Sequence, residues 1–111
     1  MTTCPHPIPY QGSKRRLAAH VLARVPDHVD TLIEPFCGSA AITLAVAHAG
    51  RARRFVLVYS LTPLCALWRR ILEEPDAIAG DYQALWSAQQ GRARVWYDEV
   101  RDAYNLDHDP A

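Results

Sequence analysis

The chain has 111 residues and no net formal charge; half of its residues are hydrophobic and 22% are charged. This composition excludes a disordered chain and predicts one small packed domain. No apolar run approaches the roughly 20 residues that a membrane-spanning helix needs, and the N-terminus lacks the apolar stretch of a signal peptide. We therefore expect a soluble, cytoplasmic protein with no membrane partner.

The charge distribution and the cysteine content exclude few classes of protein. Residues 1–56 hold seven Lys and Arg against three acids, whereas residues 57–111 hold five against nine. A basic N-terminal half is suited to phosphate groups, but the same asymmetry also arises by chance in a short chain. The three cysteines include no short-spaced pair, which indicates reduced thiols rather than a disulfide framework or a zinc site.

The N-terminal third predicts a loop, a helix and a strand, in that order. Prolines and a glycine keep residues 1–12 extended. Ser13 is placed to cap a helix that runs to about Arg24, because apolar residues recur there at helical spacing. Residues 31–34 are short and apolar without alternation, which is typical of a parallel strand buried on both faces.

The middle of the chain predicts a second helix and a second strand. Ser39 is placed to cap a helix from Ala40 to about Ala49, and Gly50 follows as its natural stop. Residues 55–59 form another continuous apolar strand. Strands that alternate with helices imply a parallel sheet with right-handed crossovers.

The C-terminal part predicts three helices. The first starts at Thr62, the second opens at Pro75, and the last runs from about Arg92 to Tyr104. In the second helix the apolar residues Ile78, Tyr82, Leu85 and Trp86 recur at helical spacing. In the last helix four residues are expected to face inward: Val95, Trp96, Val100 and Tyr104. All three tryptophans lie in this part. We interpret them as packing residues, with base stacking as the alternative.

A Glu-Pro-Phe-Cys-Gly-Ser turn, residues 34–39, follows the first predicted strand. Ligands of open parallel sheets bind beyond the carboxyl ends of the strands. Gly38 permits close approach of the backbone, and Phe36 offers a face to a flat or cationic group. The next helix begins here and supplies N–H donors to an anionic group. We interpret the turn as a binding loop for a nucleotide-type ligand; a purely structural turn is the alternative.

A second motif lies upstream, and one further position, Tyr59, departs from the usual pattern of a nucleoside site. Residues 10–16 read Tyr-Gln-Gly-Ser-Lys-Arg-Arg, an aromatic, a glycine turn and a basic helix start that suit an anion or carboxylate. A solvated basic face is the alternative.

Nucleoside sites place an acid at the end of the second strand, but Tyr59 stands there, and a bulky phenol offers only one donor.

Together these motifs resemble the adenine-specific DNA methyltransferases of the Dam class, which use S-adenosylmethionine. The family's aromatic, glycine turn and lysine are matched by Tyr10, Gly12 and Lys14. Its glycine loop is matched by residues 34–38, and the resemblance continues to the Trp-Tyr-Asp-Glu-Val-Arg-Asp-Ala-Tyr-Asn stretch at 96–105.

The resemblance implies an α/β chain with a partial Rossmann-like methyltransferase fold. A short parallel sheet with flanking helices is followed by a helical C-terminal part. Residues 1–62 would hold the N-terminal motif and the cofactor-binding βαβ part. Residues 63–111 would form the helical part, with the catalytic and target-recognition segments missing.

The resemblance also implies a set of cofactor-binding residues. They are Tyr10, Gly12, Lys14, Glu34, Pro35, Phe36, Gly38 and Tyr59. Lys14 would lie near the cofactor carboxylate, while the Glu34–Gly38 loop would line the methionine portion. Tyr59 would occupy the position of the acid that holds the ribose.

Three departures from the family pattern shape the expected function. Ala40 stands where the loop's second glycine is usual, and Tyr59 replaces the acid. In addition, no Asp-Pro-Pro or Asn-Pro-Pro followed by an aromatic occurs, and in the family that motif holds the flipped adenine. We therefore assign no catalytic residue and expect a truncated or split chain that is inactive alone.

In the whole enzyme the partner would be double-stranded DNA, methylated at adenine N6. This chain would need a C-terminal partner chain or a homodimer. The alternative function is a non-catalytic relic or binding module that pairs with DNA or with a full-length methyltransferase.

Overall fold

The computed structural model describes residues 4–9 and 12–108. The chain divides into two compact units, Met1–Trp68 and Arg69–Ala111, which we call the sheet unit and the helical unit. The predicted boundary at residue 62, with cofactor binding assigned to residues 1–62, stays a prediction.

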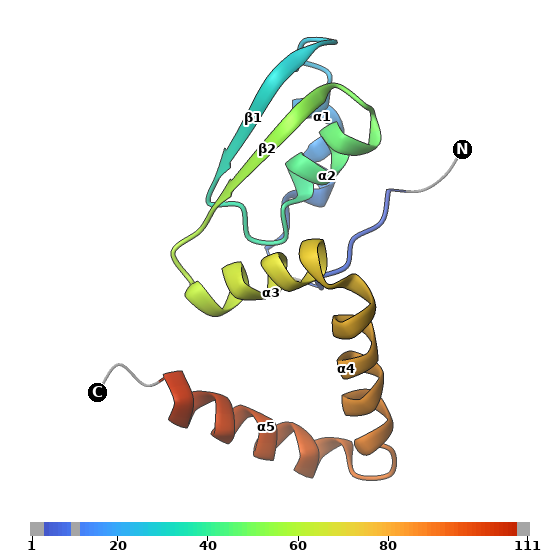
Figure 1. The fold of residues 1–111 in the computed structure, drawn as a ribbon, viewed down its shortest axis with the longest axis vertical. Helices are drawn as coiled ribbons and strands as arrows, with labels where there is room; N and C mark the ends of the chain where they lie inside the picture. Colours follow the sequence, from blue (N-terminus) through green and yellow to red (C-terminus); the bar gives the residue numbers. More distant parts are fainter. Residues whose placement is uncertain (1–3, 10–11, 109–111) are drawn as a thin grey trace. The chain divides into compact units, whose positions relative to one another are not determined.

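The sheet unit is built around two parallel strands, as predicted (Figure 1). Strand β1 pairs with β2 in a register that runs from Val29 opposite Ala52 to Pro35 opposite Val58. The elements in chain order are η1 (Lys14–Arg16), α1 (Ala18–Leu22), β1 (Val29–Pro35), α2 (Ala41–His48), β2 (Ala52–Val58) and the start of α3 (Thr62–Glu73). Both strands are longer than predicted because pairing extends them toward their N-terminal ends.

The helix predicted from Ser13 to Arg24 is not continuous. A 3-10 turn, η1, precedes the five-residue helix α1, and the Ser13 side chain makes no capping hydrogen bond. The first turn holds three consecutive cations and no acid, which opposes the positive end of a helix dipole. Without a cap or a favourable charge, the first turn tightens and the regular helix starts only at Ala18.

Only one face of the sheet is covered. Helix α2 contacts both strands and α1, and both helices lie on the same side of the strands (Figure 1). Burial therefore alternates along each strand, and the uncovered face consists of exposed residues: Thr31, Ile33, Pro35, Arg54, Val56 and Val58. The prediction that both strands are buried on both faces is wrong for the described structure.

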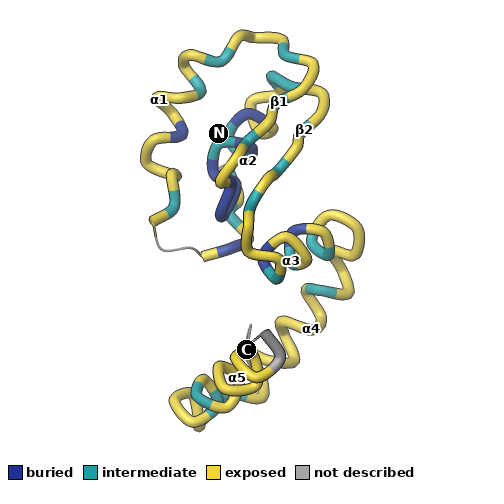
Figure 2. Tube along the Cα trace, turned by 90° about the vertical axis from the view of Figure 1, so that its left-hand side faces the viewer, coloured by how far each residue is buried: buried dark blue, intermediate teal, exposed yellow. Residues whose placement is uncertain are grey.

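The core of the sheet unit is small and centred on α2 (Figure 2). Val46 and Ala40 have no exposed surface, and Ala41 is 1% exposed. Small side chains let α2 lie close to the strands. From α3, Leu64 and Trp68 are also buried. The predicted stop of α2 is confirmed, because Gly50 follows it with a φ of +68°, a conformation that glycine adopts without strain.

The helical unit contains the end of α3, then α4 (Pro75–Ala88) and α5 (Ala93–His108). The predicted start at Pro75 is confirmed, with proline in the first turn. The expectation that the apolar residues of the last helix face inward is wrong for three of the four, since Val95, Val100 and Tyr104 are 57%, 43% and 42% exposed. Two helices without a third layer leave such residues exposed. No helix in the described part of the chain is long and apolar enough to cross a membrane.

Candidate functional site

The Glu-Pro-Phe-Cys-Gly-Ser loop continues from the carboxyl end of β1 with an unusual backbone. The Cys37 N–H donates to the Val58 carbonyl at 3.0 Å, so the strand ladder extends one residue into the loop. Three alternate residues then take left-handed conformations, with φ of +55° at Phe36, +51° at Gly38 and +56° at Ala40. Only glycine adopts this region without cost, and other residues held there cost on the order of 1–3 kcal/mol each.

Phe36 is the most distinctive residue of this loop. A bulky side chain with positive φ is a genuine conformational outlier, and Phe36 is also 88% exposed. The strain therefore keeps an aromatic ring in solvent rather than in the core. Strained backbone of this kind persists where the surrounding structure enforces it, typically at ligand sites.

Two hydrogen bonds anchor the loop from distant parts of the chain. The indole Nε1 of buried Trp68 donates to the Gly38 carbonyl at 3.0 Å. The hydroxyls of Ser13 and Ser39 lie 2.9 Å apart and share a hydrogen bond. The second contact brings the two sequence motifs together, because Ser13 belongs to the upstream glycine turn.

Glu34 caps the helix that follows the loop. Its Oε1 accepts a hydrogen bond from the Thr43 backbone N–H at 2.8 Å, which satisfies one of the unpaired donors at the start of α2. The predicted capping role of Ser39 is therefore wrong: Ala40 is the N-cap residue and supplies no side-chain bond. A carboxylate has about four acceptor positions, so Glu34 retains capacity for a ligand.

Two buried groups lie beside this cap. The Thr43 hydroxyl oxygen is buried and has no hydrogen-bond partner among the residues that the structure describes, which is uncommon for a buried polar atom. The Cys37 thiol is buried, and burial first, then the negative charge of Glu34, raises its pKa. Cys37 is therefore a neutral thiol near pH 7 and does not act as a nucleophile there.

The other predicted site residues are distributed around the loop. Tyr10 lies outside the described residues. Gly12 has a φ of +80°, which explains the glycine in the upstream turn. Lys14 is exposed, and its Nζ donates back to the Gly12 carbonyl at 3.5 Å. Pro35 ends β1 opposite Val58.

Tyr59 follows the end of β2 and is half-buried. Its backbone carbonyl accepts a weak hydrogen bond from the Cys65 thiol at 3.3 Å. The residue thus lies at the strand end where the sequence places it, but the role of its side chain stays a prediction.

Sequence reasoning missed the anchors of the loop. Trp68 was assigned to ordinary packing and Ser13 to a helix cap, whereas both hold the loop from outside. A buried indole normally finds an acceptor for its N–H, so a buried Trp68 could have been predicted to donate a hydrogen bond. Nothing in the sequence identified the acceptor.

The comparison with known families agrees with the geometry. The sequence model of the family described as D12 class N6 adenine-specific DNA methyltransferase matches residues 10–111. The chain belongs to this family. The resemblance inferred from the two motifs is thereby confirmed. No curated protein and no solved structure gives a significant match to the chain.

Proposed function

We propose that the sheet unit binds S-adenosylmethionine at the loop of residues 34–40, as part of an enzyme that methylates adenine N6 in DNA. The observation that carries the proposal is Phe36, an exposed ring on strained backbone at the carboxyl end of a parallel strand. When bound, S-adenosylmethionine supplies the methyl group. Its sulfonium is a cation, and a cation over an aromatic face is stabilised by about 0.5–2 kcal/mol.

The remaining residues of the loop fit the polar end of this cofactor. Glu34 has spare acceptor capacity for the cofactor's ammonium group. The Thr43 hydroxyl, buried and unpartnered, would gain the partner that it lacks. Lys14 would turn from its weak bond with Gly12 toward the cofactor's carboxylate. Tyr10, Pro35 and Gly38 would complete the surface around the methionine portion.

Tyr59 gives the sharpest test of the placement. An acid at this position would accept hydrogen bonds from the ribose hydroxyls, and a charged hydrogen bond is worth about 1.5–3 kcal/mol. Tyr59→Asp is therefore expected to tighten cofactor binding by roughly one to two decades, measured by calorimetric titration. Tyr97→Asp, on exposed α5, is the matched control and should leave binding unchanged. Equal affinities for wild type and Tyr59→Asp would contradict the ribose placement.

Catalysis by this chain alone is not expected. The residues that in this family hold the flipped adenine belong to an Asp-Pro-Pro-Tyr type motif, and the sequence contains no such stretch. We expect no transfer of labelled methyl groups from S-adenosylmethionine to an adenine-containing duplex. Transfer that persists in a preparation free of other methyltransferases would contradict the expectation. Activity would need the segment that carries this motif.

A second candidate function is a non-catalytic module that has lost the cofactor. Ala40 favours it, because this residue has no exposed surface and holds a left-handed conformation that a glycine would adopt without strain. The two candidates separate on wild-type affinity. Cofactor binding near micromolar supports the first, and no binding at millimolar cofactor supports the second.

A further inference from the structure

The sheet unit carries a hollow beside the upstream glycine turn. It has a volume of about 760 Å³ and is lined by His6, Gly12, Ser13, Arg15 and Arg16, and we call it the basic pocket. Among the described residues that line it, none belongs to the 34–40 loop. Lys14, the cation assigned to the cofactor, is also not among them. The basic pocket therefore adjoins the proposed cofactor site, with which it shares Gly12, but its two arginines have no role in that site.

The cations of the basic pocket are not neutralised by the protein. Within the described part of the chain, neither Arg15 nor Arg16 forms an ion pair with an acid within 4.0 Å. Both side chains are exposed. Because Arg15 and Arg16 both line the pocket, an anion bound there is attracted by two positive charges.

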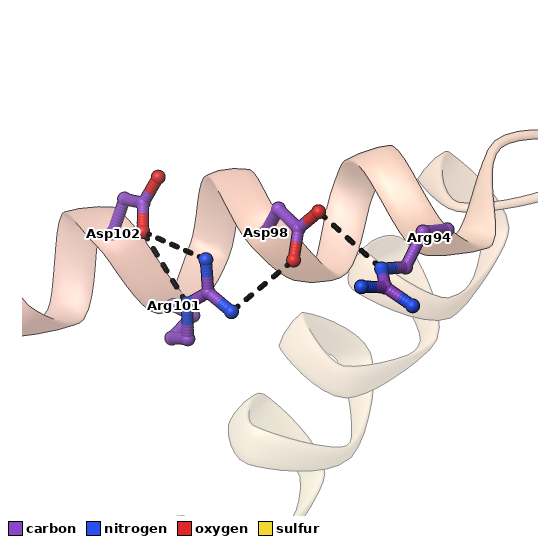
Figure 3. Close-up of polar contacts among 4 residues, drawn as sticks. All are labelled: Arg94, Asp98, Arg101 and Asp102. Atoms are coloured by element: carbon purple, nitrogen blue, oxygen red, sulfur yellow. Dashed lines mark hydrogen bonds and ion pairs between the residues drawn. The ribbon is translucent and has the colours of Figure 1, made fainter.

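Helix α5 shows the opposite arrangement, although it is equally rich in arginine (Figure 3). Arg94 pairs with Asp98 at 3.4 Å, and Arg101 pairs with Asp98 at 3.3 Å and with Asp102 at 3.2 Å. Arg92, which directly precedes α5, pairs with Glu99. Neighbouring acids balance these charges, so α5 offers little attraction to an anion. The two arginines of the basic pocket have no such acid beside them and share one hollow.

His6 forms part of the wall of the same pocket. Its Nδ1 is buried and has no hydrogen-bond partner among the described residues. Burial, followed by the positive charge of Arg15, lowers the pKa of His6. The imidazole is therefore neutral near pH 7 and reports on the occupancy of the pocket without adding to its charge.

We propose that the basic pocket binds a backbone phosphate of double-stranded DNA, with Arg15 and Arg16 as charge partners and the neutral His6 imidazole in the pocket wall. The choice of DNA as the source of the phosphate rests on the proposed function; the phosphate chemistry rests on the pocket itself. Guanidinium groups match phosphate oxygens in pairs. Such contacts fix the orientation of a protein on the duplex and carry no sequence information.

The test measures binding of a fluorescently labelled duplex to the full chain by anisotropy at several salt concentrations. The paired substitution Arg15→Gln with Arg16→Gln is compared with Arg94→Gln with Arg101→Gln, which removes the same charge from α5. The first pair should weaken binding by about tenfold or more at low salt. It should also reduce the slope of log affinity against log salt by about 2. The α5 pair should leave the slope unchanged.

Equal weakening by both pairs would overturn the proposal, because net charge would then explain it. Arg16→Lys keeps the charge and should retain the salt slope while losing affinity; full affinity in this variant would contradict a paired guanidinium contact. The substituted side chains are exposed, and we expect the circular dichroism spectrum of each variant to match that of wild type; this measurement checks that the variants fold.

The source of the phosphate is decided by nuclear magnetic resonance of the His6 imidazole. Inorganic phosphate alone and the duplex should each shift its signals, and phosphate should compete with the duplex. A shift with inorganic phosphate but none with the duplex would overturn the assignment to DNA. Cofactor titration separates the two proposals. If wild type does not bind the cofactor, the proposed function is refuted. If the Arg15→Gln, Arg16→Gln double variant binds DNA as tightly as wild type, this inference is refuted.

Discussion

At the residue scale, a single indole links α3 to the proposed cofactor loop. Trp68 is 6% exposed and donates to the Gly38 carbonyl. Trp68→Phe keeps an aromatic ring but removes the indole donor, which leaves that buried carbonyl with only the weak contact from the Cys37 thiol at 3.9 Å. We expect the free energy of unfolding to fall by about 1–3 kcal/mol, measured by urea denaturation of the full chain.

The matched control is Trp86→Phe. Trp86 is 55% exposed, and a surface substitution of this kind usually changes stability by less than about 0.5 kcal/mol. If both variants unfold at the same urea concentration as wild type, the bond between Trp68 and Gly38 is not an anchor of the loop.

At the residue scale, the sequence identified the residues that form the loop but not the contacts that hold the loop in its conformation. The loop residues 34–39 were recognised because glycine and proline mark turns by their own backbone preferences. The left-handed conformations of Phe36 and Ala40 were not predictable, since neither residue type prefers them. They arise because contacts from outside the loop hold it in place.

At the element scale, α2 depends on a cap from a neighbouring strand. Glu34 →Ala removes the acceptor of the Thr43 N–H, and loss of a capping acceptor costs about 0.5–2 kcal/mol. We expect lower stability of that size in urea denaturation without cofactor. Glu34→Gln retains an amide oxygen as acceptor and should lose less. Equal stability of Glu34→Ala and wild type would show that the cap contributes nothing.

The elements themselves were predicted unevenly. The strands, α2 and the start of α4 follow from local signals, because apolar runs and helix-breaking glycine or proline bound them. The helix expected from Ser13 to Arg24 failed because three consecutive cations at its start outweigh a good apolar spacing. The cap by Glu34 is a contact between elements, so helix periodicity alone did not indicate it.

At the scale of the whole chain, each unit leaves apolar surface uncovered. The open sheet face includes Ile33 at 62% exposure, and the helical unit leaves Tyr82 at 66% and Tyr97 at 62%. Such surface normally contacts another layer or partner. The sequence predicted a parallel sheet but not its uncovered face. A continuous apolar run predicts a buried strand, but it does not show whether a second layer of the same chain covers that strand. A partner chain or a homodimer remains our expectation for this surface.

The central claim is that the loop of residues 34–40 is the cofactor site, and amide chemical shifts test it most directly. Titration of the isotope-labelled full chain with S-adenosylmethionine should shift the amides of residues 34–43 and 12–14. The amides of α5 should stay in place. No shifts at millimolar cofactor, or shifts confined to the helical unit, would contradict the claim.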